Sequence, residues 1–346
     1  MSPAGTAEEA VGPEEAWELL ERARMLTEPA LRKAVARLPE PVRPLAAYHF
    51  GWRDADGDPA EGGWGKGVRG ALALASARAV GGTAEQAVAA AAGVELVHNF
   101  SLLHDDLMDR DATRRGRPAV WARFGEGPAV LTGDALLVLA MEALADEPGA
   151  VAELCEALLV LVGGQGADLE FETRGDVRLD ECLRMAAGKT APLLSAACAL
   201  GALAAGAAPE RTAALRRFGH HLGVAFQLTD DLLGIWGRSA RSGKPVGADL
   251  RHRKKSPPVV AALASGTPAG RELAELYLRG TGPLDDAGVR TAAELVERAG
   301  GRAWAEKEAA RQRAEALAAL DAGAPAPEGA RALASLAGLI TAGRER

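Results

Sequence analysis

The segment ELVHNFSLLHDDLMD, residues 95–109, closes a helical pattern that spans residues 84–109 and ends in three carboxylates. Asp105 and Asp109 are four residues apart and share one face of such a helix, whereas Asp106 lies about 100° further round. Three acids this close repel one another unless a cation neutralises them, and carboxylate oxygens at this spacing suit Mg²⁺. Taken alone, the cluster would more often be a solvated acidic helix end, so the rest of the sequence has to decide.

A second acidic pair, Asp230-Asp231, follows another helical run, and basic residues accompany both clusters. The accompanying residues are Arg114 and Arg115 after the first cluster, and Lys189, Lys244, Lys254 and Lys255 around the second. Carboxylates that hold Mg²⁺, together with separate cations, are what a bound diphosphate requires. A surface salt-bridge network would mix the two signs more evenly. The two clusters therefore indicate a site for a metal-bound diphosphate.

The remaining sequence predicts an all-α protein. Ala, Leu, Arg and Glu dominate, and all four favour helices, whereas aromatic residues make up only 4% of the chain. Helical patterns cover residues 68–80, 84–109, 129–144, 149–172, 179–203, 208–236, 256–265 and 329–341, and no convincing strand alternation is found. We expect a disordered N-terminus over residues 1–14 and a single all-α domain over residues 15–346.

Charge and hydropathy exclude several other classes of protein. Forty Lys plus Arg against 47 Asp plus Glu give a net charge of −7, which argues against a nucleic-acid binder that relies on bulk basicity. The N-terminus has no apolar signal segment, and we find no uncharged apolar run long enough to span a bilayer. These features predict a cytoplasmic protein without a membrane span.

The order and spacing of several motifs, from about Gly62 to Ser256, resemble those of the trans-polyprenyl diphosphate synthase family of isoprenyl chain elongation enzymes. Within that family the chain is most similar to short-chain geranylgeranyl and farnesyl diphosphate synthases of bacterial type. Residues 95–109 resemble the first aspartate-rich motif, and Phe226-Gln227 with Asp230-Asp231 resemble the second. The other matching elements are Arg114-Arg115-Gly116, Gly133-Asp134 with Leu136-Leu137, Lys189-Thr190, and Gly243-Lys244-Pro245 with Gly247-Ala248-Asp249.

The resemblance implies a large helical bundle around a central active-site cavity, in a homodimer. The implied reaction is the Mg²⁺-dependent condensation of isopentenyl diphosphate with an allylic diphosphate (dimethylallyl, geranyl or farnesyl) by ionisation, condensation and elimination. Asp105, Asp109 and Asp230 would hold Mg²⁺, with three ions expected per site, and Asp106 and Asp231 would support them. The resemblance further implies that the allylic diphosphate is bound by Arg114, Lys189 and Lys244, and that Lys254 also binds substrate. Isopentenyl diphosphate would be bound by Lys66, Arg69, His98 and Arg115. Thr190 and Gln227 would contact the reacting carbons.

Three glycines depart from the family pattern. Where the family has a GGKRxRP-like segment, residues 65–70 read GKGVRG, so that Gly67 replaces the middle Arg and Gly70 replaces the Pro. We expect these glycines to loosen the loop and to weaken binding of isopentenyl diphosphate. Gly234 stands where the second motif often has its last aspartate, yet the third Mg²⁺ is still expected because the implied ligand is Asp230.

Product length is expected to depend on Phe100 and Ser101, which precede Asp105 by five and four residues. Phe100 lies about 7.5 Å back along the helix axis, and by the resemblance a bulky residue here stops elongation. One aromatic residue, one small neighbour and a motif without insertion indicate C20, geranylgeranyl diphosphate, with C15 farnesyl diphosphate second. The alternative is that Phe100 is an ordinary core residue.

Two other functions stay open at this point. A class I terpene cyclase also ionises a prenyl diphosphate, but it usually has an Asn/Ser/Glu metal triad, which we do not find near residue 230, and it does not need the cations of residues 66–69. A non-catalytic subunit of a heteromeric synthase would not require intact carboxylates in both clusters. Gln165 and Asp168, which are polar residues in an apolar helix, face either the site or a buried network.

Overall fold

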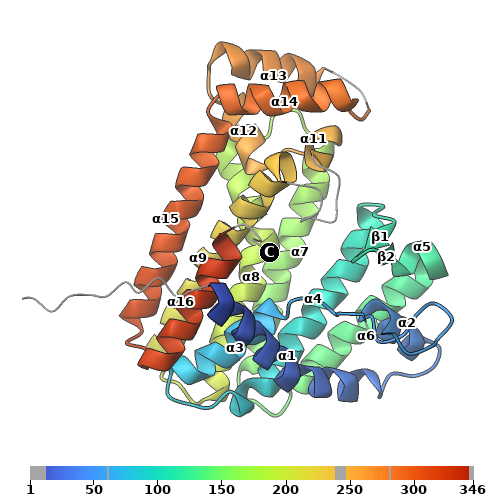
Figure 1. The fold of residues 1–346 in the computed structure, drawn as a ribbon, viewed down its shortest axis with the longest axis vertical. Helices are drawn as coiled ribbons and strands as arrows, with labels where there is room; N and C mark the ends of the chain where they lie inside the picture. Colours follow the sequence, from blue (N-terminus) through green and yellow to red (C-terminus); the bar gives the residue numbers. More distant parts are fainter. Residues whose placement is uncertain (1–12, 61, 238–246, 280–281, 343–346) are drawn as a thin grey trace, which may run out of the picture.

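The fold is a helical bundle, described by a computed structural model over residues 13–60, 62–237, 247–279 and 282–342. The all-α expectation is confirmed (Figure 1). Residues 1–12, which belong to the N-terminus for which the sequence predicts disorder, lie outside this range, and the first helix begins at Pro13. Lys244 also lies outside the described residues.

The helices follow the chain with short connections. Their bounds are α1 Pro13–Val35, α2 Val42–His49, α3 Val68–Ala79, η1 Glu85–Ala87, α4 Val88–Met108, α5 Val120–Phe124, α6 Glu126–Ala143, α7 Ala150–Thr173, α8 Leu179–Ala204, α9 Pro209–Trp236, α11 Ala248–Arg251, α12 Pro257–Leu263, α13 Pro268–Leu278, α14 Asp286–Arg298, α15 Gly301–Ala322 and α16 Pro327–Thr341. Most expected helices therefore end within one or two residues of the observed bounds.

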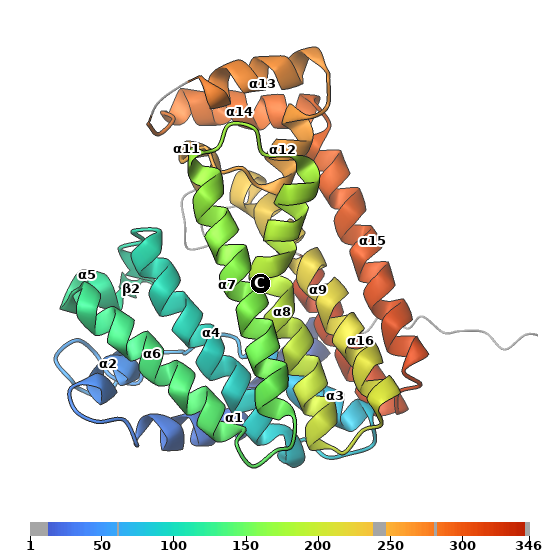
Figure 2. The same ribbon diagram turned by 180° about the vertical axis from the view of Figure 1, so that it is seen from behind.

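Two groups of helices form the walls of the molecule. Helices α7, α8, α9 and α15 run lengthwise in both views, while α4 and α6 form a second wall beside them (Figures 1 and 2). Helix α8 packs against α3, α7 and α9 and is the most enclosed of the long helices. Helices α13 and α14 lie across one end of the bundle and share a small core of their own with α11 and α12.

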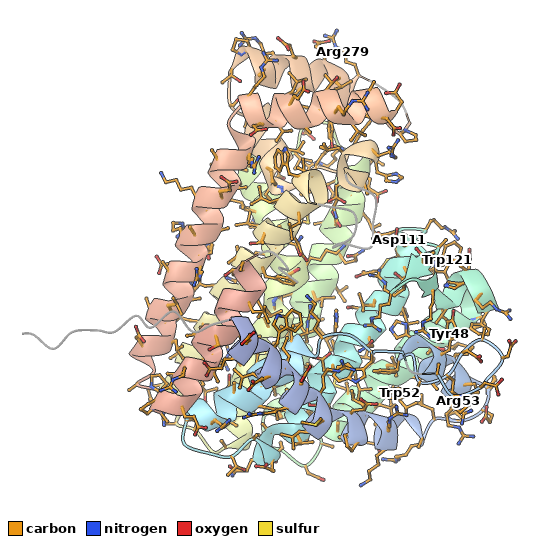
Figure 3. All side chains as sticks on the ribbon, viewed as in Figure 1. Tyr48, Trp52, Arg53, Asp111, Trp121 and Arg279 are labelled. Carbon is orange, nitrogen blue, oxygen red and sulfur yellow. The ribbon has the colours of Figure 1, made fainter. Side chains whose placement is uncertain are left out.

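A short hairpin follows α4 and was not expected from the sequence. Strand β1, Thr113–Arg114, pairs with β2, Arg117–Pro118, in antiparallel register. Arg115 and Gly116 form the turn with φ of 53° and 74°, the left-handed values that a tight turn requires. Trp121 Nε1 donates to the carbonyl oxygen of Asp111, 2.9 Å away, and so holds the segment beyond α4 (Figure 3). The hairpin thereby fixes the two consecutive arginines next to the first acidic cluster.

Two helices, α7 and α8, are long and apolar enough to cross a membrane by length and composition, although the sequence predicts no membrane span. Of the most apolar window of α8, 83% is buried inside the bundle, as expected for the core helix of a globular protein. The corresponding share for α7 is only 22%, so that helix presents an apolar surface outward.

Candidate active site

The first acidic cluster lies at the C-terminal end of α4. Asp106 points into the protein, where it is 1% exposed and forms an ion pair with Arg114, whose Nε lies 2.8 Å from Asp106 Oδ1. Burial raises the pKa of Asp105 to about 6, with the Lys189 ammonium opposing the shift and the neighbouring Asp109 adding to it. Asp105 therefore lies near the Lys189 ammonium of another helix and shares its surroundings with like charges, as a diphosphate-metal site requires.

The opposite wall places two lysines around one carboxylate. Lys189 Nζ lies 2.9 Å from Asp168 Oδ2, and Lys254 Nζ lies 3.7 Å from the same oxygen. The backbones approach closely beside this pair, because a Cβ on Gly164 of α7 would lie 2.5 Å from the carbonyl carbon of Gly188 in α8. Only glycine permits this crossing, which brings Asp168 and Lys189 together. Asp168 thus pairs with two lysines from other parts of the fold, where the sequence left open whether it faces the site or a buried network.

A chain of hydrogen bonds connects α8 with the second acidic cluster on α9. The Thr190 hydroxyl donates to Gln227 Oε1, and Gln227 Nε2 donates to Asp231 Oδ1 at 3.0 Å. Burial raises the pKa of Asp231 to about 8, while the Lys254 ammonium opposes this shift. Asp230, the next residue, is partly exposed and lies near enough to Arg69 to stabilise the charge of its guanidinium.

A third group of residues lies between α2, the start of α3, α4 and the hairpin. Burial and the guanidinium groups of Arg69 and Arg115 hold the pKa of His98 well below its usual value, so its imidazole is neutral near pH 7. Arg115 donates to Asn99 Oδ1 at 3.3 Å, and the same oxygen contacts the ring of His49 at 3.1 Å. Lys66, the fourth residue predicted to bind isopentenyl diphosphate, has its ammonium over the Trp17 ring, 4.9 Å from the ring centroid.

The carboxylates fit Mg²⁺ that arrives together with a diphosphate. Over the described residues, no three His, Cys, Asp or Glu side chains lie close enough to hold a metal ion unaided. Magnesium usually takes one or two carboxylates, with waters and substrate phosphates completing its shell. Within the same residues, Oδ2 of Asp231 is buried without a hydrogen-bond partner, and the mutual repulsion around Asp105 would be relieved by a cation. The donor set therefore suits the ion.

The residues expected to limit product length lie on α4 next to α6. Phe100 is 9% exposed, and its ring packs edge-on against His104 with centroids 4.8 Å apart. His104 Nε2 contacts the Val130 carbonyl oxygen at 3.1 Å, and a Cβ on Gly133 would lie 2.4 Å from that nitrogen. A side chain at Gly133 would therefore displace the His104 ring from its contact with α6. Ser101 donates to the His98 carbonyl oxygen at 2.9 Å.

The sequence singles out some polar residues of this region without assigning them a role. Asp168 and Gln165 were noticed only as polar positions in an apolar helix, and Gln165 is 7% exposed with no hydrogen-bond partner for its amide among the residues that the structure describes. Gly234 leaves room for Asp249 of α11, since a Cβ on Gly234 would lie 2.6 Å from Asp249 Oδ2. A carboxylate from α11 therefore occupies the space beside the position where the motif often has its own aspartate.

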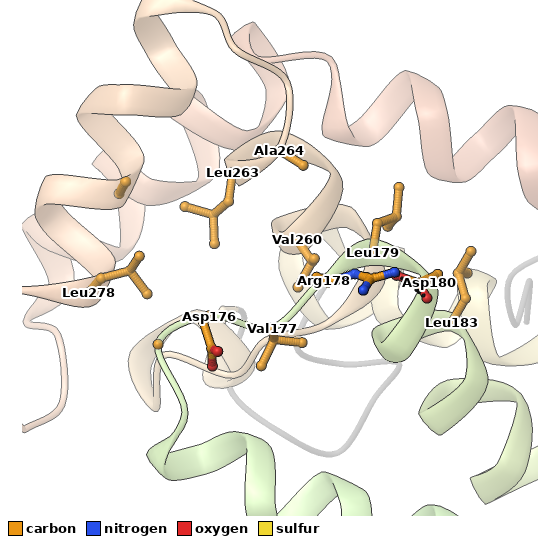
Figure 4. A pocket seen from close by; sticks show the side chains of 12 residues that line it. Asp176, Val177, Arg178, Leu179, Asp180, Leu183, Val260, Leu263, Ala264 and Leu278 are labelled. Carbon is orange, nitrogen blue, oxygen red and sulfur yellow. Dashed lines mark hydrogen bonds and ion pairs between the residues drawn. The ribbon is translucent and has the colours of Figure 1, made fainter.

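Two cavities lie outside the acidic clusters, although both are partly lined by residues of α8. One, of about 690 Å³, is lined by the α7–α8 connection, α12 and α13 (Figure 4). The other, of about 730 Å³, is lined by residues of α7, α8, α9 and α15. Neither is lined by a residue of the two acidic clusters. The candidate active site is therefore defined by the two acidic clusters on α4 and α9 with Lys189 and Lys254, and not by either cavity.

Comparison with known proteins finds relatives that match most of the chain. A model of the polyprenyl synthetase family matches residues 61–296. The (2E,6E)-farnesyl diphosphate synthase of Mycobacterium tuberculosis is 50% identical over 296 residues, which cover 84% of this chain and 82% of that one. The geranylgeranyl diphosphate synthase of the same organism is 48% identical over 316 residues, 90% of each chain.

A solved structure extends the similarity to the fold. The polyprenyl synthetase from Streptomyces coelicolor A3(2) superposes with a TM-score of 0.88 at 45% sequence identity, covering 93% of this chain and 98% of that chain. The similarity thus reaches well beyond Ser256, the last position of the motif resemblance. The chain belongs to the polyprenyl synthetase family.

Proposed function

We propose that this protein is a Mg²⁺-dependent prenyl transferase that joins isopentenyl diphosphate to an allylic diphosphate. The expected class of enzyme is confirmed by the farnesyl and geranylgeranyl diphosphate synthases that share about half of its residues, and the terpene cyclase alternative has no such support. The observation that carries the proposal is the pair of acidic clusters on α4 and α9, with Lys189 and Lys254 beside them.

The allylic diphosphate would bind between these clusters. Asp105, Asp109 and Asp230 would hold Mg²⁺, which when bound neutralises the diphosphate and makes it a better leaving group. Lys189 and Lys254 would bind the remaining phosphate oxygens, and Asp168 keeps these two ammonium groups close to each other. Such preorganised charges stabilise the charge that develops when the carbon–oxygen bond breaks.

The second substrate would bind at the group around Arg69 and Arg115. Neutral His98 between two guanidinium groups can accept or donate a hydrogen bond without adding charge. Thr190 and Gln227 would lie beside the reacting carbons, where their oxygen dipoles face the carbocation. Holding the double bond of isopentenyl diphosphate against that cation converts the condensation into an intramolecular step.

We propose C20 as the main product and C15 as the second candidate. Phe100 would limit chain elongation below the first acidic cluster, because its ring is buried and packs against His104. Relatives of both product lengths are similarly close in sequence. Incubation with isopentenyl diphosphate, Mg²⁺ and dimethylallyl, geranyl or farnesyl diphosphate in turn, followed by identification of the prenyl products, tests both the activity and the length. Absence of any elongated product from all three primers would contradict the proposal.

We further propose a homodimer that uses the outer faces of α6 and α7, on the side seen in Figure 2. Exposed apolar side chains on these helices are Val130, Leu131, Val138, Leu159, Val160 and Val162. Exposed apolar surface of this extent marks an interaction site. Light scattering should give twice the chain mass of 35.7 kDa, and Leu159→Glu should give monomers while Met25→Glu, an exposed site on α1, should not. A monomeric wild type would contradict the dimer.

Four expectations stay predictions of the sequence: three Mg²⁺ per site, a single domain over residues 15–346, a cytoplasmic location and the absence of a membrane span. The dimer proposal gives α7 a protein neighbour for its apolar face. A membrane-bound form would instead sediment with vesicles of phosphatidylcholine, and the soluble form would not.

A further inference from the structure

The carboxylate of Glu95 is buried and has no role in the proposed reaction. Glu95 lies on α4, one turn before His98, and is 2% exposed. Its Oε1 accepts a hydrogen bond from the backbone N–H of Gly70 at 2.8 Å. Burial raises the pKa of Glu95, and the Arg69 guanidinium opposes that shift. Because burying a carboxyl group is costly without partners, the contacts of Glu95 at the start of α3 require an explanation.

Glu95 supplies the N-terminal cap that the sequence of α3 lacks. The helix begins at Val68 after Gly67, which has φ of 67° and no side chain that could accept a hydrogen bond. Gly70 is the third residue of the helix, so its N–H has no acceptor within the helix. A carboxylate at this end is also favoured by the helix dipole. Glu95 thus joins the first turn of α3, which carries Arg69, to α4.

Gly70 makes this hydrogen bond possible. In the family pattern this position is a proline, which has no N–H to donate. Glycine provides the donor, and the surroundings would accept a small side chain, since a Cβ here would lie 3.4 Å from Glu95 Cγ and 3.5 Å from Thr27 Oγ1. The glycine that was expected to loosen this segment therefore adds a contact to its start.

The guanidinium of Arg69 keeps unused hydrogen-bonding capacity. Burial lowers the pKa of Arg69, while Glu95 and Asp230 stabilise its charged form. Over the described part of the chain, its buried Nε has no hydrogen-bond partner. A guanidinium that sits on a fixed backbone and keeps a free Nε donor is suited to a phosphate group.

We propose that Glu95 is a positioning residue, which caps α3 through the N–H of Gly70 and thereby holds Arg69 toward the diphosphate of isopentenyl diphosphate. Glu95 acts through Arg69 and does not touch the substrate. The inference rests on the proposed function, because it assumes that isopentenyl diphosphate binds at Arg69.

The test compares the Michaelis constants of both substrates in four variants. Glu95→Gln keeps the shape and one oxygen acceptor but removes the charge, and Gly70→Pro removes the donor. Gly70→Ala keeps the N–H and should have a smaller effect than Gly70→Pro, while Glu21→Gln changes an exposed carboxylate of α1 as a control. We expect Glu95→Gln and Gly70→Pro to raise KM for isopentenyl diphosphate about tenfold, the scale of one hydrogen bond to a charged group, with KM for farnesyl diphosphate changed less than about twofold.

The outcomes separate this inference from the proposed function. Equal changes in both Michaelis constants, or a lower melting temperature with unchanged KM for isopentenyl diphosphate, would assign Glu95 a purely structural role and overturn the inference. If Glu95→Gln does not fold, the comparison of Gly70→Pro with Gly70→Ala decides, and equal KM values in these two would overturn it. A wild type that does not consume isopentenyl diphosphate would instead overturn the proposed function.

Discussion

Asp168 on α7 holds two ammonium groups, with Lys189 Nζ 2.9 Å and Lys254 Nζ 3.7 Å from the same carboxylate oxygen. The lysines come from α8 and from the segment after α11, which are far apart in the sequence. Asp168 therefore keeps two like charges together at the place where a diphosphate would bind. The pKa of Asp168 is held below its usual value by Lys254 and Lys189, which outweigh the effect of its burial.

Asp168→Asn should lower turnover by about 10- to 100-fold. Loss of the carboxylate leaves Lys189 and Lys254 to repel each other, and a charge-assisted hydrogen bond contributes about 1.5–3 kcal/mol, which converts to this range of rates. Steady-state turnover with saturating substrates checks it. Asp176→Asn, an exposed carboxylate on the α7–α8 connection, is the matched control. Equal turnover of the two variants would show that Asp168 has no part in the site.

Asp105→Ala and Asp230→Ala should each lower turnover at least about 100-fold, the scale of one major electrostatic contact in the transition state. The reason is that both carboxylates would hold Mg²⁺ on the same diphosphate. Turnover is measured at saturating Mg²⁺, with Asp56→Ala in an exposed loop as the control. Near-normal turnover in either variant would remove its assignment as a metal ligand.

Lys66→Ala and Arg69→Ala should raise KM for isopentenyl diphosphate much more than KM for the allylic substrate. Each variant removes a charge-assisted contact of about 1.5–3 kcal/mol. The effect should be larger for Arg69, which is partly buried, than for Lys66, which is exposed and lies over the Trp17 ring. Lys33→Ala, on an exposed face of α1, is the control. A parallel rise of both Michaelis constants would contradict the assignment.

Phe100→Ala should lengthen the products beyond those of the wild type. The ring of Phe100 packs against His104 one turn from the acidic cluster, so its removal opens space directly below the bound diphosphate. Mass spectrometry of the prenyl products checks the length distribution. Phe124→Ala, whose ring packs on Tyr48 in another part of the fold, should leave it unchanged. An unchanged product distribution in an active Phe100→Ala enzyme would show that another residue limits the product length.

Gly234→Ala should lower turnover, because its Cβ would lie 2.6 Å from Asp249 Oδ2 and would displace that carboxylate from the second cluster. Gly127→Ala on α6 adds the same methyl group where no atom lies within 4 Å, and it should keep wild-type turnover. Equal activity of both variants would show that the position of Asp249 does not matter.

The helices could be predicted closely because their apolar patterns are long and are punctuated by Pro and Gly. The range 179–203 became Leu179–Ala204, and 208–236 became Pro209–Trp236. The hairpin at residues 113–118 could not be predicted, since strands of two residues have no periodicity. Its φ values at Arg115 and Gly116 are set by the local turn and its contacts with α2 and α4.

Site residues that belong to a sequence motif could be predicted, whereas site residues that are defined by a contact between helices could not. Asp105 and Asp230 could be identified from spacing, because two acidic clusters with nearby cations form a pattern. Asp168 and Glu95 are single acids in apolar helices, and their partners Lys189 and Gly70 are 21 and 25 residues away. Only the packing of α7 on α8 and of α3 on α4 reveals these pairs.

The most direct test of the account is the ratio of diphosphate released to isopentenyl diphosphate consumed, measured with farnesyl diphosphate and Mg²⁺ present. A prenyl transferase breaks one allylic carbon–oxygen bond for each new carbon–carbon bond. The account therefore predicts a ratio of one, with no release when isopentenyl diphosphate is omitted. Release of diphosphate from farnesyl diphosphate alone, with isopentenyl diphosphate left unconsumed, would contradict it.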